Sequence, residues 1–334
     1  MGLVFWIGIK GSLAQMAHHP VNPNATPEAR ELLDFLSEIS GKRVMSGQHN
    51  FPGGISRYSE EAAEIGGSYP AVWGQDFGFS ADDQDGVHFR DQVIAEAIRQ
   101  YRDGSIVTLM WHAVQPTHDE PVTFKENIIG SLSDADWEAL ITPGTALHQR
   151  WIDQSDVIAT LLKRLLYENI PVLWRPYHEM NGDWFWWCNR PGPRGYQALY
   201  RQLYHRFVQV HGLNNLLWVW NANAPRHDAK EYPPFFPGHD VVDVLATDVY
   251  ANDYRPEHYR AILELANGKP IAFGEVGDMP TPELLAREPM WAWFMTWSGF
   301  TSDHNDPTEV RRLYQDPRTL HRPARLSDAE PSGT

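Results

Sequence analysis

The stretch Ile170-Pro-Val-Leu-Trp-Arg-Pro-Tyr-His-Glu179 begins as an apolar run and ends in polar residues. An apolar run without alternation is typical of a strand that is buried on both faces, as in a parallel sheet covered by helices. Seven further runs of similar composition are spread along the chain. Together they predict strands at residues 43–48, 69–76, 105–112, 170–179, 215–221, 241–250, 270–275 and 291–297.

Helical patterns lie between these runs. Thr26 followed by Pro27 is typical of a helix start, because threonine caps the first turn and proline is tolerated at its first position. Apolar residues at intervals of three and four predict further helices at residues 91–101, 147–167 and 195–210. Prolines are frequent after Asn223, so that segment is expected to be a long loop with one short helix.

Strands that alternate with helices over one undivided chain favour an α/β fold, a single-domain (β/α)8 TIM barrel. The alternative is an open doubly wound sheet, but no glycine-rich phosphate turn follows any of the predicted strands. We expect the barrel to span residues 24–318. Residues 1–23 would be a signal or leader with an N-terminal arm, and residues 319–334 a disordered tail.

The predicted barrel fold also predicts where the active site lies, because active-site residues of such barrels gather at the C-terminal ends of the strands. Polar and aromatic residues do collect at the ends of the predicted strands, while the strand bodies stay apolar. These residues are Gln48, His49, Trp73, Asp76, Trp111, His112, His178, Glu179, Asn221, Asn223, Asp248, Tyr250, Glu275 and Trp297.

Glu179 and Glu275 are the candidate catalytic residues. Most of the 43 acidic residues are expected to be solvated, but these two lie among apolar and aromatic neighbours. Two carboxyl groups across a barrel mouth suit cleavage of a glycosidic bond: one stays protonated and donates to the leaving oxygen, and the other is ionised. Like charges held close together in an aromatic site push the two pKa values apart.

Several other residues are candidates for substrate binding. His112 and His178 could orient a carboxylate or bind a hydroxyl, although a histidine at a strand end is often only structural. Trp184, with its neighbours Trp186 and Trp187, is interpreted as a stacking surface. Tyr250 could donate to the ionised carboxylate or pack at the rim, and Trp297 could form the floor under a sugar ring. No metal-binding motif is present, so we expect neither a metal nor a cofactor.

The composition and charge of the chain exclude some classes of binding partner. Lys+Arg 28 against Asp+Glu 43 gives a formal charge of −15, and no basic run occurs, so neither nucleic acid nor an anionic membrane is an expected partner. The apolar run at residues 3–9 is too short to span a bilayer. With Ser12-Leu-Ala14 it resembles a signal peptide, although Lys10 interrupts the run and a basic segment is missing. We therefore expect a secreted or periplasmic protein with an atypical signal.

Longer motifs add a resemblance to a known family. Arg175-Pro-Tyr-His-Glu-Met-Asn-Gly-Asp-Trp-Phe-Trp-Trp187 resembles the acid/base signature of glycoside hydrolase family 26, and Phe273-Gly-Glu-Val-Gly277 resembles its nucleophile strand. Ser46-Gly-Gln48, Trp111-His112 and Asp248-Val-Tyr250 fall in the order that this family requires, and Trp297 follows them. The resemblance extends over residues 24–316.

The resemblance implies a retaining endo-β-1,4-mannanase that hydrolyses mannan-type polysaccharides by double displacement. Glu179 would be the acid/base and Glu275 the nucleophile. By the same resemblance His112, His178, Trp184, Tyr250 and Trp297 would bind the sugar. Cys188 and Ser298 depart from the family pattern, the second at a position where some mannanases carry arginine. A β-1,3-1,4-glucanase, a β-1,3-xylanase or a non-catalytic carbohydrate-binding barrel therefore stay open as alternatives.

Overall fold

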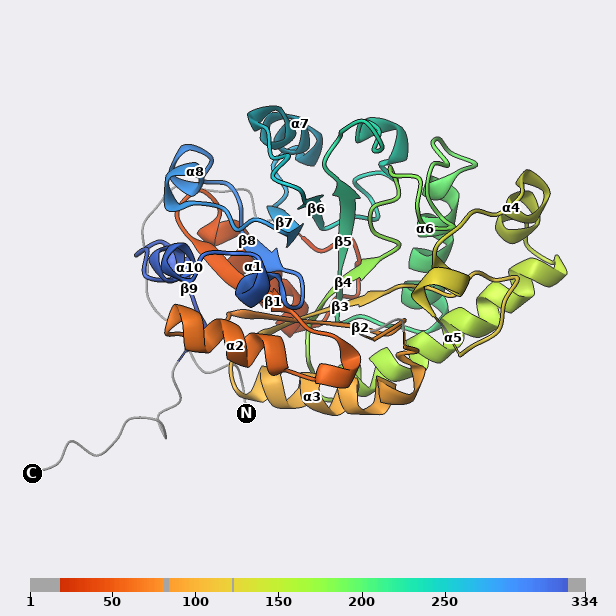
Figure 1. The fold of residues 1–334 in the computed structure, drawn as a ribbon. Helices are drawn as coiled ribbons and strands as arrows, with labels where there is room; N and C mark the ends of the chain where they lie inside the picture. The colour runs from red at the N-terminus through yellow and green to blue at the C-terminus, as the bar shows by residue number, and fades with distance from the viewer. Residues whose placement is uncertain (1–18, 81–83, 122, 324–334) are drawn as a thin grey trace, which may run out of the picture.

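Parallel strands close into a barrel at the centre of the computed structural model, which describes residues 19–80, 84–121 and 123–323 (Figure 1). Each strand pairs with the next along the chain, and β8 pairs with β1 to close the circle. All eight predicted strands are confirmed. They are β1 (Val44–His49), β2 (Val72–Asp76), β3 (Ile106–Trp111), β4 (Val172–Pro176), β5 (Leu216–Asn223), β6 (Val244–Val249), β7 (Ile271–Val276) and β8 (Trp293–Thr296).

Helix α1 (Pro27–Ile39) closes the N-terminal end of the barrel. It starts where the sequence predicts, because the Thr26 side chain accepts a hydrogen bond from the backbone N of Ala29 at 3.2 Å. Its buried leucines pack against small and apolar side chains from the strands, including Val219 and Ala246. Apolar side chains therefore fill the N-terminal end of the barrel.

The remaining helices cover the outside of the barrel (Figure 1). The predicted helices at 91–101, 147–167 and 195–210 are confirmed, the last ending in a π-helical turn at Arg206–Val210. The loop after Asn223 contains only the short 3-10 helix Pro233–Phe235. The α-helices are α2 (Arg57–Gly66), α3 (Arg90–Arg102), α4 (Asp134–Ile141), α5 (Ala146–Tyr167), α6 (Tyr196–His205), α7 (Pro256–Ala266), α8 (Pro282–Arg287), α9 (Phe300–Asp303) and α10 (Pro307–Tyr314).

The folded unit is wider at both ends than the predicted range 24–318. At the start, the backbone N of Val21 donates to Asp243 Oδ1 at 2.7 Å. At the end, Thr319–Leu320 forms strand β9 beside β1, so the predicted disorder is wrong there. The reason is backbone pairing: Val44 N donates to Arg318 O at 3.0 Å before the strand begins. The predicted leader at 1–18 and the tail at 324–334 lie outside the described residues.

Within the described ranges, none of the helices combines the length and the apolar character needed to cross a membrane.

Helices α2 and α10 lie side by side, and Gly66 in α2 allows the two helices to pack closely. A Cβ at Gly66 would meet three atoms of the Tyr314 ring at 2.3, 2.6 and 2.9 Å. Tyr314 is itself buried. We predict that Gly66→Ala lowers the free energy of unfolding by about 1–3 kcal/mol, because the overpacked ring must move. Guanidinium unfolding followed by circular dichroism measures this change.

Gly54→Ala is the matched control. A Cβ at Gly54 would have its nearest neighbour at 3.8 Å, and its backbone is not in the left-handed region. Its unfolding free energy should stay within about 1 kcal/mol of the parent protein. Equal destabilisation by both substitutions would contradict the packing argument.

Candidate active site

The Glu179 side chain is placed by an irregular loop rather than by a strand. The sequence predicts a strand up to residue 179, but β4 ends at Pro176, and Tyr177 and Glu179 have φ values of +50° and +55°. This left-handed conformation is uncommon outside glycine and persists only where neighbours hold it. Here the backbone N of Glu179 donates to Asn221 O at 2.8 Å, and its carbonyl accepts from Gly182 N at 3.0 Å.

Two asparagines tie this loop to the end of β5. The side chain of Asn181 donates to Asn223 O at 2.8 Å and accepts from Asn223 N at 2.8 Å. The side chain of Asn223 in turn donates to Glu179 Oε1 at 2.9 Å. The loops after two neighbouring strands therefore act as one support for Glu179.

Glu275 is directed into the pocket by a bulge in β7. In the pairing with β6, Thr247 is opposite Phe273 and Asp248 is opposite Glu275, which leaves Gly274 as an extra residue. A Cβ at Gly274 would lie 1.7 Å from Asn221 Oδ1 and 2.7 Å from Asp248 Oδ1, so only glycine fits. A bulge of this kind turns the following side chain, here that of the candidate nucleophile.

Two donors hold the Glu275 carboxylate. Arg175 Nη2 donates to Oε1 at 2.9 Å, and the Tyr250 hydroxyl donates to Oε2 at 2.7 Å. Arg175 is fully buried and also donates to the carbonyl of Gly274 at 2.9 Å. A buried guanidinium and a hydroxyl donor thus hold both oxygens of the Glu275 carboxyl group in a fixed orientation.

The surroundings of Glu179, by contrast, disfavour a negative charge on its carboxyl group. Burial, followed by the nearby charge of Glu275, raises the pKa of Glu179 to about 7. Hydrogen bonds from Asn223 and from Trp184 Nε1, which lies 2.8 Å from Glu179 Oε2, oppose this rise. The side chain is only 8% exposed, so the proton-bearing form is well populated near neutral pH.

Asp248 is a third buried carboxyl group in the same cluster. Its Oδ1 lies 3.8 Å from Arg175 Nη2, beyond hydrogen-bond distance. Burial, followed by the charge of Glu275, raises the pKa of Asp248 well above its usual value. The ligand atoms of His178, Asp248 and Glu275 all lie within 4.8 Å of one another, as in a metal site. However, Arg175 already supplies the positive charge that a metal ion would bring.

The two predicted histidines meet at the floor of the site, with ring centroids 4.5 Å apart. His112 Nδ1 lies 2.9 Å from Asp76 Oδ2. Burial opposes ionisation of Asp76, but the charge and hydrogen bonds of His112 outweigh it and lower the pKa of Asp76. Burial, then the charge of His112, lowers the pKa of His178 well below its usual value, so His178 is neutral. Its Nε2 lies 3.9 Å from Glu275 Oε1.

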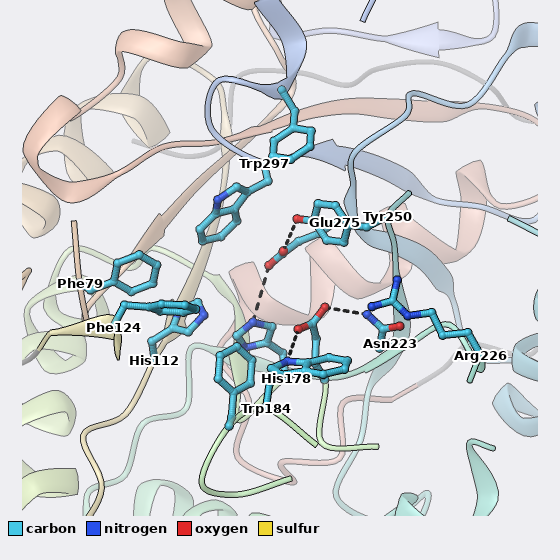
Figure 2. A pocket seen from close by; sticks show the side chains of 13 residues that line it. Phe79, His112, Phe124, His178, Trp184, Asn223, Arg226, Tyr250, Glu275 and Trp297 are labelled. Carbon is cyan, nitrogen blue, oxygen red and sulfur yellow. Dashed lines mark hydrogen bonds and ion pairs between the residues drawn. The ribbon is translucent and has the colours of Figure 1, made fainter. Parts of the chain in front are cut away.

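A pocket of about 320 Å³ brings all seven predicted site residues together (Figure 2). Only part of the predicted tryptophan surface is present, because Trp186 and Trp187 are buried and donate to the carbonyls of Ala113 and His178. Trp184 alone of the three lines the pocket. Asn223, one of the predicted strand-end residues, also lines the pocket, and the sequence did not single out five further lining residues, namely Phe79, Phe124, Phe185, Arg226 and Phe300.

The two ends of the pocket differ in composition. Figure 2 shows Phe79, Phe124 and His112 at the left and Asn223 and Arg226 at the right, with His178 between them. The left end is aromatic, since the Phe79 ring lies 4.7 Å from Phe124 and 4.8 Å from His112. The right end is polar and holds Glu179 through its bond from Asn223.

Comparisons with known proteins place the chain in one enzyme family. The model of glycosyl hydrolase family 26 matches residues 21–323. A mannan endo-1,4-beta-mannosidase from Thermothelomyces thermophilus is 34% identical over 306 residues, covering 88% of this chain and 60% of that protein. Mannan endo-1,4-beta-mannosidase A from Piromyces sp is 32% identical over 289 residues, covering 83% of this chain and 45% of that protein. The chain thus spans about half the length of the curated relatives it matches.

Solved structures give the same result. GH26A from Muricauda sp. MAR_2010_75 superposes with a TM-score of 0.86 at 46% identity, over 90% of this chain and 98% of that one. The GH26-CBM35 β-(1,4)-mannanase of Podospora anserina superposes with a TM-score of 0.77 at 31% identity, over 91% of this chain and 68% of that one. On the family model and these relatives, the chain belongs to glycosyl hydrolase family 26.

Proposed function

We propose that this protein is a retaining endo-β-1,4-mannanase with Glu179 as acid/base and Glu275 as nucleophile. The observation that carries the proposal is that two carboxyl groups in one pocket lie in opposite surroundings, one held by two hydrogen-bond donors and the other shifted by burial. Arg175 and Tyr250 donate to Glu275, whereas burial raises the pKa of Glu179 to about 7. Glycosidic cleavage with retention needs this division of roles.

In the first step, a carboxylate oxygen of Glu275 attacks the anomeric carbon while Glu179 gives its proton to the glycosidic oxygen. The bond to the leaving sugar breaks, and a glycosyl ester forms on Glu275. As negative charge leaves Glu275, it no longer raises the pKa of Glu179, which favours the ionised carboxylate. In the second step Glu179 therefore takes a proton from water, and the resulting hydroxide releases the sugar with retained configuration.

The names of similar proteins support mannan as the substrate. Several similar proteins bear the name mannan endo-1,4-beta-mannosidase. A β-mannanase from a termite symbiont, 26% identical to this chain, has been solved with a gluco-manno-oligosaccharide. The aromatic side chains at one end of the pocket suit the apolar faces of pyranose rings.

We further propose that the protein is secreted or periplasmic and works without a metal or cofactor. An enzyme that hydrolyses a mannan polymer outside the cell has to be exported in order to reach it. Fractionation of a producing culture tests the proposed location.

The proposal that catalysis needs no metal is supported by Arg175, whose guanidinium contacts the carboxylates that a metal would need. Activity that survives EDTA agrees with it, and loss of activity on chelation would overturn it.

Substitution of either glutamate tests the catalytic roles. Glu275→Ala should abolish turnover of both mannan and aryl mannosides, because no nucleophile is left. Glu179→Ala should lower kcat on mannan by about 10²–10⁴-fold, the usual contribution of a general acid. It should still release a nitrophenolate leaving group rapidly, because that group needs no proton, and then accumulate the glycosyl-enzyme. Stopped-flow absorbance and intact-protein mass spectrometry measure the two outcomes.

Glu288→Gln serves as the control for loss of a buried carboxylate elsewhere. Glu288 is 6% exposed and bonds Tyr254, which does not line the pocket. Its kcat should match the parent protein, with melting curves used to show that all variants are folded. Normal activity on mannan in either Glu179→Ala or Glu275→Ala would overturn the assignment.

The pH profile tests the raised pKa of Glu179. The first step needs the protonated acid, so kcat/KM should fall about tenfold for each pH unit above a midpoint near 7. The charge of Glu275 contributes to the rise, so Glu275→Gln should lower the pKa of Glu179. Carboxyl ¹³C NMR of that variant measures the change directly. An unchanged midpoint in the variant would contradict the electrostatic coupling.

Substrate choice and stereochemistry are tested together. Galactomannan, lichenan and β-1,3-xylan are offered separately, and we expect the highest reducing-sugar release from galactomannan. Proton NMR during the first minutes should show the β-anomer of the product. Initial release of the α-anomer would exclude retention. Faster release of reducing sugar from lichenan or xylan would show that one of these, and not mannan, is the preferred substrate. Binding without products would indicate a non-catalytic barrel.

A further inference from the structure

Asp76 is a buried acidic residue that contacts the active site from outside. It ends β2 and does not line the active-site pocket, whereas His112, which follows β3, does. In the pairing of β2 with β3, Asp76 is opposite Met110, so its side chain lies close to the residues just beyond the end of β3. Asp76 therefore contacts a residue of the pocket without being able to touch a substrate itself.

Backbone N–H groups surround the Asp76 carboxyl group. Its Oδ1 accepts hydrogen bonds from the backbone N of Gly78 at 3.0 Å and of His112 at 2.9 Å. Its Oδ2 accepts from the backbone N of Phe79 at 3.4 Å and lies 2.9 Å from His112 Nδ1. Donors arranged in this way favour an ionised carboxyl group. The pKa of Asp76, which is lowered although burial opposes this, agrees with the arrangement.

The Asp76 carboxylate fixes where the His112 ring carries its hydrogen. An ionised carboxyl group only accepts hydrogen bonds, so Nδ1 of His112 has to be the donor across the 2.9 Å contact. In a neutral imidazole one nitrogen donates and the other accepts, which leaves Nε2 as the acceptor. Because Nδ1 is occupied by Asp76, Nε2 is the ring nitrogen that remains for a ligand in the pocket.

The packing around His112 holds the ring in this orientation. Its centroid lies 4.8 Å from that of Phe79 and 4.5 Å from that of His178, and both rings are nearly perpendicular to it. The turn after Asp76 is packed closely onto the backbone of His112, since a Cβ at Gly78 would lie 2.2 Å from the His112 carbonyl oxygen. The loops after β2 and β3 are thus built around the contact between Asp76 and His112.

The place of His112 in the pocket indicates which sugar it would contact. Figure 2 shows His112 beside Phe79, at the end of the pocket away from Asn223. Asn223 donates to the acid Glu179, which protonates the oxygen of the leaving sugar. The sugar at the His112 end is therefore the one that Glu275 attacks.

We propose that Asp76 is a positioning residue of the active site. It keeps the hydrogen of His112 on Nδ1, so that Nε2 accepts a hydrogen bond from a hydroxyl group of the attacked sugar. The proposal rests on the proposed glycosidase function and assigns a role in it to a residue that does not touch the substrate. A hydrogen bond to the attacked sugar that strengthens toward the transition state increases the rate of attack by Glu275.

Asp76→Asn tests the proposed tautomer. The substitution keeps the size of the side chain and an oxygen for the backbone N–H groups, but it places an NH2 donor against His112 Nδ1. The hydrogen of the ring should then move to Nε2. Nitrogen-15 NMR of histidine-labelled protein near neutral pH measures this, with the His112 signals identified by their loss in His112→Ala. We expect the hydrogen on Nδ1 in the parent protein and on Nε2 in Asp76→Asn.

Kinetics test whether the tautomer matters for the reaction. Asp76→Asn should lower kcat/KM about 10- to 100-fold on both galactomannan and dinitrophenyl β-mannoside, the usual cost of a mismatched hydrogen bond in a buried site. The loss on the second substrate distinguishes this role from that of Glu179, because a dinitrophenolate leaving group needs no proton. In a His112→Ala background Asp76→Asn should cause no further loss, since Asp76 acts through His112.

Asp243→Asn is the matched control. Asp243 is as deeply buried as Asp76 and also accepts backbone N–H groups, from Val21 at 2.7 Å and Trp218 at 2.8 Å, but it precedes β6 at the opposite end of the barrel. Its kcat/KM should equal that of the parent, and melting curves show whether all variants are folded.

Three results would overturn the proposal. They are a parent His112 without a hydrogen on Nδ1 or with hydrogens on both nitrogens, an unchanged tautomer in Asp76→Asn, and an undiminished effect of Asp76→Asn in the His112→Ala background. The first is read from the parent spectrum and does not require the Asp76 variant to fold. Failure of the parent protein to cleave either substrate would instead overturn the proposed function, which the NMR result does not depend on.

Discussion

The buried contact between Arg175 and Glu275 is the interaction on which the site depends. Arg175 belongs to β4 and Glu275 to β7, so the 2.9 Å hydrogen bond spans the inside of the barrel. Burying a guanidinium is costly unless it is paired, and here it donates both to Glu275 and to the carbonyl of Gly274. One cation cannot neutralise three buried carboxylates. Burial, followed by the charge of Glu275, raises the pKa of both Glu179 and Asp248, and the asymmetry needed for acid/base chemistry follows.

Two local departures from regular structure aim the catalytic side chains. Glu179 sits in a left-handed loop after β4, and Glu275 follows the bulge at Gly274. Both are supported from β5, where Asn221 and Asn223 contact the loop and the bulge. The eight regular strands and the α1 plug provide the stability against which such irregular conformations can be held.

Much of the fold was predictable from the sequence, because strands buried on both faces leave continuous apolar runs. The two glutamates were predictable for the same reason, since an acidic residue at the end of an apolar run has no solvent-facing explanation. Arg226 and Phe79 were not found, because both come from loops whose course depends on tertiary contacts. Trp186 and Trp187 show the converse error: adjacent tryptophans look like one surface, but the turning loop buries two and leaves Trp184 in the pocket.

By itself, the sequence determined the strand order, the family and the identity of the two catalytic candidates. All three depend on residue type and position along the chain. The motifs assigned the acid/base role to Glu179 by resemblance, but only the tertiary structure shows why its pKa is raised, because a pKa depends on burial and on charges brought together from β4, β6 and β7. The tertiary structure also decided that the Phe51 ring packs against Phe79 and Trp297, since these three residues are far apart in the sequence.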